Sequence, residues 1–294
     1  MMILIVGPTA SGKSALALEI AKHFQGEIIN GDAFQIYQEF DIGTAKPTLE
    51  ERSIVPHHLF DFVSPTDHFS PKEYQILARE KIEEIVKRNH LPIIVGGSGN
   101  YQKATLYDYQ YEEYVDPDMS KYDDYTNEEL YAELLKVDEE ACKKIHPNNR
   151  KRVLRALMTY IGTGKRKSEI ESEQEHIMLY DCLIIGIDMD RDLLYQKIDE
   201  RVIEMIHQGL EKEARTLYQK YGKDIQPFQA IGYKEWIDYF ENKSDKETVI
   251  LEIQKHSRNY AKRQMTYFRH QFDVRWFHSK EEAYHYIEEQ LKGV

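Results

Sequence analysis

Short apolar runs alternate with longer amphipathic segments along most of this 294-residue chain. The apolar runs predict strands at residues 3–6, 27–30, 54–62, 92–95, 183–188 and 274–277. Apolar positions with helical spacing predict helices at residues 15–24, 71–88, 191–206, 210–221, 234–240 and 246–268. Because apolar strands alternate with helices, we expect an α/β fold with a doubly wound parallel sheet, closed at one edge by residues 274–277.

The middle of the chain has a different pattern. Residues 107–131 are rich in Tyr, Asp and Glu and hold few aliphatic residues, which predicts a small, loosely packed insertion. Helices are expected at residues 127–136 and 138–145, followed by a strongly periodic basic helix at residues 149–160. We therefore expect a core domain formed by residues 1–108 and 147–294, with a small helical insertion domain at residues 109–146.

The first predicted strand leads directly into the sequence GPTASGKS. Its glycines, lysine and final serine satisfy the G-x-x-x-x-G-K-[ST] pattern of a P-loop, between a strand and a helix as that motif requires. Such a loop turns backbone N–H groups toward phosphate oxygens, while Lys13 adds a mobile charge and Ser14 is expected to hold Mg²⁺. The predicted fold is therefore P-loop NTPase-like. The residues expected to bind a diphosphate or a triphosphate, ATP included, are Gly7, Pro8, Thr9, Ala10, Ser11, Gly12, Lys13 and Ser14.

Two further segments follow predicted strands. Asp32 comes just after the strand at residues 27–30, and the sequence GGSG at residues 96–99 follows the strand at residues 92–95. Ligands of parallel sheets gather at the carboxyl ends of the strands, so these segments and the P-loop should share one crevice. There Asp32 could accept a proton or orient a nucleophile, whereas the equally weighted alternative is that it only caps a turn at residues 33–37.

The net charge of −12 argues against a nucleic-acid partner, but the distribution of charge reverses that conclusion. Residues 143–168 contain nine Lys or Arg and no acid, and residues 253–272 contain five more, again without an acid; the acids concentrate in residues 112–140 and 169–175. Arg152 and Arg155 are three residues apart, share a helix face and suit a leaving diphosphate, although a solvated helix face is the alternative. Lys262 and Arg263 lie among aromatic residues, a pattern that suits RNA or, equally, an amphipathic helix with an aromatic core stripe.

The composition of the chain excludes several classes of protein. No stretch approaches 18 apolar residues, and the apolar N-terminal run lacks the basic start and cleavage site of a signal peptide. Cys142 and Cys182 are too few for a disulfide framework or a zinc site, and the histidines lack the H-x-x-x-H spacing of a transition-metal site. We expect a cytoplasmic monomer that does not enter membranes.

Seven sequence blocks, in order along nearly the whole chain, resemble the tRNA dimethylallyltransferases, also called tRNA isopentenyltransferases of the adenosine-37 type. The blocks are GPTASGKS at residues 7–14, GDAFQIYQEFDIGTAKP at 31–47, GGSGNY at 96–101, HPNNRKRVLRAL at 146–157, TGK at 163–165, QAIGYKE at 229–235 and SRNYAKRQMTYFR at 257–269. The resemblance implies transfer of a dimethylallyl group from dimethylallyl diphosphate to N6 of adenosine 37, in the anticodon stem-loop of tRNA, with release of diphosphate.

The resemblance also implies roles for individual residues. Asp32 matches the proton acceptor, and Thr9 matches a residue that helps to hold the diphosphate or the reacting amine. Lys13, Arg152 and Arg155 carry charge that can stabilise the departing diphosphate in such a reaction. Positions implied to contact tRNA are Asp32, Ala33, Phe34, Gln35, Ser98, Lys151, Arg152, Val153, Leu154, Arg155, Gln229, Ala230, Ile231, Gly232, Tyr233, Lys234, Lys262 and Arg263.

The chain departs from the family pattern at a few positions. Asn100 stands where Leu is usual, Lys151 where Arg is usual, and Asp138 and Glu139 replace Asp-Pro; Ser98 replaces Thr with its hydroxyl kept, and the insertion is shorter than usual.

The main alternative is a P-loop kinase acting on a small molecule or nucleotide, which would leave the basic stretches unexplained. A non-catalytic RNA-binding regulator is a third interpretation, but it would have no need of a base at Asp32.

Overall fold

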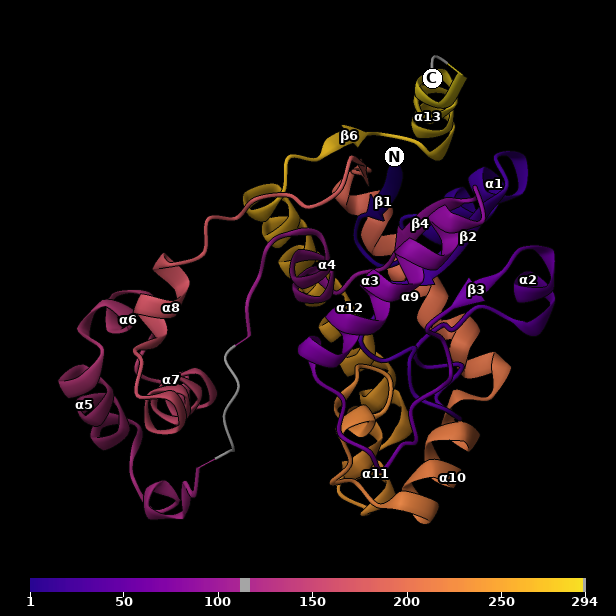
Figure 1. Ribbon diagram of the computed structural model, residues 1–294. Coiled ribbons are helices and arrows are strands. Elements are labelled where there is room, and N and C mark those ends of the chain that lie inside the picture. The colour runs from indigo at the N-terminus through magenta and orange to yellow at the C-terminus, as the bar shows by residue number, and fades with distance from the viewer. Residues whose placement is uncertain (112–116, 293–294) are drawn as a thin grey trace. The chain divides into compact units, whose positions relative to one another are not determined.

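The structure, a computed structural model, describes residues 1–111 and 117–292 (Figure 1). The chain forms two compact units. The first comprises Met1–Leu106 and Tyr180–Val294, and the second comprises Tyr107–Leu179. Residues 112–116, part of the acidic stretch and of the insertion predicted from the sequence, lie outside the described residues.

A six-stranded sheet forms the centre of the first unit, with the order β3-β2-β4-β1-β5-β6 and every neighbouring pair parallel. Its strands are β1 (Met2–Val6), β2 (Gly26–Asn30), β3 (His57–His58), β4 (Leu91–Val95), β5 (Cys182–Ile187) and β6 (Arg275–Phe277). β1 lies between β4 and β5, so its carboxyl end is at the middle of the sheet edge. The predicted α/β fold with a parallel sheet is confirmed.

Helices connect these strands. They are α1 (Lys13–His23), α2 (Leu49–Ile54), α3 (Pro71–Lys87), α4 (Gly99–Leu106), α9 (Arg191–Gln208), α10 (Leu210–Tyr221), α11 (Ile237–Phe240), α12 (Lys246–Gln271) and α13 (Lys280–Lys292). The sequence analysis did not predict α2, α4 or α13, and the helix expected at residues 234–240 is a 3₁₀ turn, η3 (Lys234–Trp236), followed by α11. Local sequence sets several boundaries: Ser70 and Glu73 form a capping box at the start of α3, and Gly209, with φ 105°, ends α9. Within the described residues, no helix has both the length and the apolar character needed to cross a bilayer.

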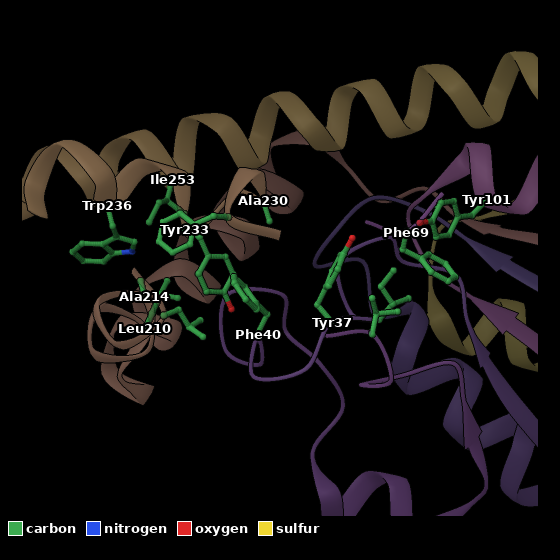
Figure 2. Close-up of a cluster of buried hydrophobic side chains, with 14 of the residues drawn as sticks. Tyr37, Phe40, Phe69, Tyr101, Leu210, Ala214, Ala230, Tyr233, Trp236 and Ile253 are labelled. Carbon is green, nitrogen blue, oxygen red and sulfur yellow. The ribbon is translucent and has the colours of Figure 1, made fainter. Parts of the chain in front are cut away.

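Two apolar cores hold the first unit together. One lies under the sheet, where Ile3, Ile28 and Ile185 pack with residues of α1 and α13. The other contains residues on α9, α10 and α12 and is rich in aromatic side chains, with Phe40 and Tyr233 fully buried within it (Figure 2). Because this second core includes Ile36, Tyr37 and Phe40, it fixes the segment that follows β2 and Asp32.

The second unit is helical and well packed, not loosely packed as its composition predicted. It contains η1 (Ser120–Tyr122), α5 (Asn127–Val137), α6 (Glu139–Lys144), α7 (Arg150–Thr163) and α8 (Lys167–Ser172). Leu130, Leu134 and Val153 are fully buried in its core. Asp138 accepts hydrogen bonds from the backbone N–H of Ala141 at 3.0 Å and of Ser168 at 3.0 Å, so it caps α6 and ties α8 to it.

The boundary of this unit differs from the boundary expected at residue 146. The unit continues to Leu179 and includes the basic helix α7, which the sequence analysis had assigned to the core domain. The reason is packing: Val153, Ala156 and Leu157 of α7 belong to the same apolar core as Leu130 and Leu134 of α5. A helix whose apolar face packs against α5 folds with α5, whatever the charge on its other face.

Candidate functional site

The glycine-rich loop between β1 and α1 has the backbone conformations that its sequence allows. Gly7 has φ 147° and Gly12 has φ 88°, and a side chain at Gly7 would come within 3.1 Å of the carbonyl oxygen of Ile187. Lys13 opens α1, and its Nζ donates a hydrogen bond to the carbonyl oxygen of Pro8 at 3.1 Å. The side chain of Lys13 therefore folds back over the loop, as a phosphate-binding lysine requires.

A cavity of about 540 Å³ opens beside this loop. It is lined by Thr9, Lys13 and Ser14 from the loop, by Asp32, and by Gly96 at the end of β4. All three segments that follow β1, β2 and β4 thus contribute to one cavity, which is the arrangement expected from a parallel sheet. Ser98, by contrast, is not among the residues that line the cavity.

Asp32 combines the two roles that the sequence left open. Its Oδ1 accepts a hydrogen bond from the backbone N–H of Phe34 at 2.9 Å, so the carboxylate caps the turn that follows. The same side chain lines the cavity, where burial raises its pKa, while the hydrogen bond from Phe34 and the charge of Lys13 act in the opposite direction. A carboxylate with a raised pKa that faces a cavity is a suitable proton acceptor.

Lys13 is also perturbed. Burial and the nearby charge of Arg201 lower its pKa from 10.5 to about 8, and the charge of Asp32 opposes this shift. An ammonium group held in this way lacks sufficient negative charge around it, and the phosphate groups of a ligand would supply that charge.

Arg201 is a cavity residue that the sequence analysis missed. It lies on α9, with Ile198, Val202 and Met205 also lining the cavity. Burial lowers the pKa of Arg201, and the charge of Asp32 raises it, so the two side chains interact across the site. The signal in the sequence is a single arginine within an apolar helix face, since residues 198, 201, 202 and 205 share one side of a helix.

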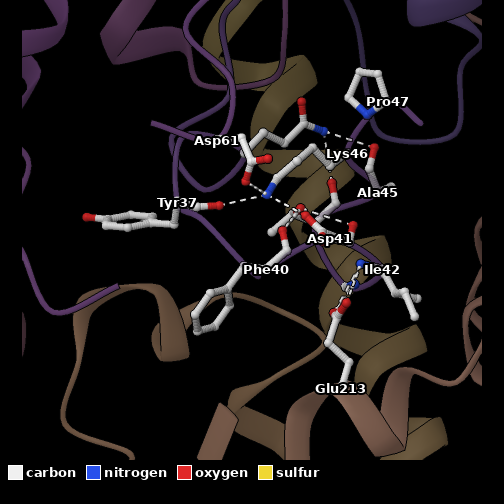
Figure 3. Close-up of polar contacts among 12 residues, drawn as sticks. Tyr37, Phe40, Asp41, Ile42, Ala45, Lys46, Pro47, Asp61 and Glu213 are labelled. Carbon is white, nitrogen blue, oxygen red and sulfur yellow. Dashed lines mark hydrogen bonds and ion pairs between the residues drawn. The ribbon is translucent and has the colours of Figure 1, made fainter. Parts of the chain in front are cut away.

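The segment Asp41 to Pro47 forms another wall of the cavity, to which residues 43–47 contribute. It is held by Lys46, whose buried Nζ donates to the carbonyl oxygen of Tyr37 at 2.7 Å and contacts the carboxylates of Asp41 at 2.5 Å and Asp61 at 2.8 Å (Figure 3). Glu213 on α10 holds the other part of the segment, because its carboxylate accepts a hydrogen bond from the backbone N–H of Ile42 at 3.0 Å (Figure 3). Two clusters from distant parts of the sequence therefore fix this wall.

The residues expected to contact tRNA in the QAIGYKE block differ in their positions. Gln229, Ala230, Ile231, Gly232 and Lys234 line the cavity. Tyr233 is fully buried, and its hydroxyl accepts a hydrogen bond from the N–H of Gly43 at 3.0 Å and donates one to Glu213 at 2.6 Å. The side chain of Tyr233 thus supports the cavity wall from behind.

The residues expected around Asp32 and on α12 are also divided. Phe34, Gln35 and Arg263 line the cavity, whereas Lys262 is exposed outside it. Arg263 lies over the ring of Tyr260, with its guanidinium carbon 5.6 Å from the ring centroid. Gln264, which the sequence analysis did not select, is buried and accepts a hydrogen bond from the N–H of Thr9 at 3.0 Å, so α12 also holds the P-loop.

Two residues that were expected to contact tRNA, Ser98 and Val153, make contacts within the protein instead. The hydroxyl oxygen of Ser98 accepts a hydrogen bond from the N–H of Ala33 at 2.9 Å, which links the β4 loop to the turn after Asp32. In the second unit, Val153 is fully buried in the helical core, Leu154 is half-buried, and Lys151, Arg152 and Arg155 are exposed on α7. The cavity residues named above all belong to the first unit.

No group of three or more His, Cys, Asp or Glu side chains suited to a metal ion occurs among the described residues. A metal at this site would therefore depend on the hydroxyl of Ser14 and on ligand oxygens. The fold and the site together define an α/β protein with a glycine-rich loop at the centre of a parallel sheet and the carboxylate of Asp32 on the same cavity.

Comparison with known proteins identifies the family. A family model described as IPP transferase matches residues 35–271, so the chain belongs to the IPP transferase family. It is 45% identical to a tRNA dimethylallyltransferase of Bacillus pumilus, over 99% of this chain and 96% of the relative, and 45% identical to that of Bacillus subtilis, over 94% and 90%.

Solved structures agree with this assignment. A tRNA delta(2)-isopentenylpyrophosphate transferase of Staphylococcus epidermidis is 40% identical, with a TM-score of 0.74 over 99% of this chain and 98% of the other. A eukaryotic dimethylallyltransferase acting on tRNA is 29% identical, with a TM-score of 0.82 over 94% and 73%. Membership of a transferase family does not favour the kinase or the non-catalytic RNA-binding alternative.

Proposed function

We propose that this protein transfers a dimethylallyl group from dimethylallyl diphosphate to N6 of adenosine 37 in tRNA and releases diphosphate. The observation that carries the proposal is the cavity in which the P-loop, Arg201 and Asp32 lie together, in a chain of the IPP transferase family. Phosphate-binding groups and a proton acceptor on one cavity are what such a transfer requires.

The diphosphate of the donor binds at the P-loop. Lys13 and Arg201 supply positive charge, and loop N–H groups together with Thr9 supply hydrogen-bond donors. The allylic C–O bond breaks as negative charge collects on the departing diphosphate, so these groups stabilise the transition state more than the ground state. Arg152 and Arg155 add to this charge, a role that rests on their shared helix face and bidentate charge and on the family resemblance.

Mg²⁺ fits the chemistry of the site. Ser14 lines the cavity next to Lys13 and offers a hydroxyl oxygen, the type of ligand that Mg²⁺ takes together with phosphate oxygens and water. Held there, Mg²⁺ would neutralise part of the charge on the diphosphate.

Asp32 acts on the acceptor. The exocyclic amine of adenine is a weak nucleophile, which must lose a proton as the new C–N bond forms. Asp32 takes that proton, and its raised pKa suits the task. The adenine reaches the cavity by leaving its stack, which costs little in a single-stranded anticodon loop. Cytoplasmic tRNA is the expected partner, bound by a monomer through the QAIGYKE segment, α12 and α7.

Product analysis tests this function. The protein is incubated with labelled dimethylallyl diphosphate and an unmodified tRNA transcript, and the RNA is then digested to nucleosides. We expect the label in N6-dimethylallyladenosine, without consumption of ATP. Label-free RNA together with phosphate transfer from ATP would instead favour a kinase.

Replacement of Asp32 tests the mechanism separately. The Asp32→Asn variant removes the proton acceptor and keeps the shape of the side chain, so the single-turnover rate should fall by roughly 10²–10⁴. The affinity for tRNA should remain nearly the same. A rate close to that of the unaltered protein would remove Asp32 from the catalytic role.

A further inference from the structure

Asn30, the last residue of β2, is fully buried and is absorbed by none of the sequence motifs above. Its side chain forms hydrogen bonds with the backbone N–H and the backbone carbonyl oxygen of Asp32. Oδ1 of Asn30 accepts a hydrogen bond from the N–H of Asp32 at 2.8 Å, and Nδ2 donates one to the carbonyl oxygen of Asp32 at 3.0 Å. The side chain of Asn30 thus pairs with both polar backbone groups of Asp32, the residue proposed to accept the proton.

Asn30 is itself held in place by neighbouring segments. Its Nδ2 donates a second hydrogen bond, to the carbonyl oxygen of Leu59 at 2.9 Å, and its own carbonyl oxygen accepts one from the hydroxyl of Tyr74 at 2.7 Å. Tyr74 is fully buried on α3, and Leu59 follows β3 with a φ of 60°. The amide therefore connects three segments and has little freedom to move relative to the sheet.

We propose that Asn30 is a positioning residue for the transfer reaction, which fixes the backbone of Asp32 so that its carboxylate faces the cavity. The inference rests on the proposed function, in which Asp32 accepts the proton. Asparagine suits this position because its amide oxygen accepts from the N–H of Asp32 and its amide nitrogen donates to the carbonyl oxygen of Asp32. Aspartate could accept but not donate, and alanine could do neither.

The effect on the reaction follows from geometry. A proton acceptor works only within hydrogen-bond reach of the amine, and a misplacement of about 1 Å can cost on the order of 100-fold in rate. Asn30 does not line the cavity, so its loss should leave the binding of both substrates nearly unchanged. Loss of rate with unchanged affinity separates positioning from a contribution to binding.

Gln75 offers a matched control. It is a buried amide of the same unit, and its Nε2 donates to the carbonyl oxygen of Ala104 at 2.6 Å, which links α3 to α4 away from the cavity. Both Asn30→Ala and Gln75→Ala remove a buried amide from a hydrogen-bonded network and should lower Tm. Only Asn30→Ala should alter the rate.

The test is a double-mutant cycle between Asn30→Ala and Asp32→Asn, read by single-turnover rates with saturating tRNA transcript and dimethylallyl diphosphate. We expect Asn30→Ala to lower the rate about 10- to 100-fold in the unaltered protein and less than about twofold in the Asp32→Asn background. The affinity for tRNA, and the rate and affinity of Gln75→Ala, should remain close to those of the unaltered protein.

Two results would overturn the inference: an unaltered rate for Asn30→Ala, or the same loss in both backgrounds. If Asn30→Ala does not fold, the same cycle is run with Asn30→Ser, whose shorter side chain carries one polar atom in place of the two of the amide. Failure of the unaltered protein to modify the transcript would instead reject the proposed function, so the two failures are distinguishable.

Discussion

The lowered pKa of Lys13 makes binding of a diphosphate depend on pH. In the free protein this pKa is about 8, so about nine-tenths of the molecules carry the ammonium group at pH 7 and about one-tenth at pH 9. The bound diphosphate favours the charged form, so binding at pH 9 must add a proton to Lys13. The dissociation constant for dimethylallyl diphosphate should therefore be about tenfold higher at pH 9 than at pH 7, with about 0.9 proton taken up per ligand at pH 9.

The assay is isothermal titration calorimetry without tRNA, so that no transfer takes place. Titrations in buffers of different ionisation enthalpy give the number of protons taken up on binding. The terminal phosphate of the ligand, with a pKa of about 6, is almost fully ionised between pH 7 and pH 9, so it contributes little to this number. The matched control is Lys13→Arg, since a guanidinium stays charged up to at least about pH 12. Its affinity, whatever its value, should not change between pH 7 and pH 9.

Two observations would refute this reasoning. One is an affinity of the unaltered protein that is equal at pH 7 and pH 9. The other is proton uptake that persists in Lys13→Arg, which would assign the titration to Asp32 or to another group in the cavity.

Three further changes give separate tests. Arg201→Met removes a charge that lowers the pKa of Lys13, so the pH at which diphosphate affinity begins to fall should move upward; an unmoved value would contradict the coupling between the two cations. Lys262→Ala and Arg263→Ala should each weaken tRNA binding and reduce the slope of log K against log salt by about 1, and an unchanged slope would return these residues to a structural role. Lys46→Met should lower the free energy of unfolding, measured in urea, by about 2 kcal/mol, because the carbonyl oxygen of Tyr37 and the carboxylates of Asp41 and Asp61 lose the buried ammonium group of Lys46; an unchanged midpoint would show that this cluster adds nothing.

Most of the strands and the P-loop could be predicted because their signals are local, whereas the strand expected at residues 54–62 is limited to β3 (His57–His58) and begins after α2. Ile3, Ile28 and Ile93 belong to short apolar runs, and the loop that ends at Ser14 is defined by residue types at fixed spacing. Helix α4 was missed for the opposite reason: it begins at Gly99 and its sequence is poorly helical, so its position depends on contacts such as the hydrogen bond from Gln102 to the carbonyl oxygen of Gly96 at 2.8 Å.

The residues that support the site were harder to predict. Arg201, Asn30 and Gln264 lie on three different elements far apart in the sequence, and each acquires its role only when the fold brings it to the cavity or to a loop beside it. No spacing rule connects such residues. The boundary at residue 146 placed α7 in the core domain, whereas its buried residues, Val153 and Leu157, pack in the core of the second unit.

The order of strands has a consequence for synthesis of the protein on the ribosome. β1 is made first, but one of its two neighbours, β5, begins only at Cys182, and the backbone N–H of Thr9 bonds to Gln264 near the other end of the chain. A nascent chain that has emerged only as far as the second unit can already bury that unit's helices, yet its phosphate loop still lacks both contacts. Competence for the donor is thus acquired late, and a chain truncated before α12 should expose an unfinished sheet to chaperones and proteases.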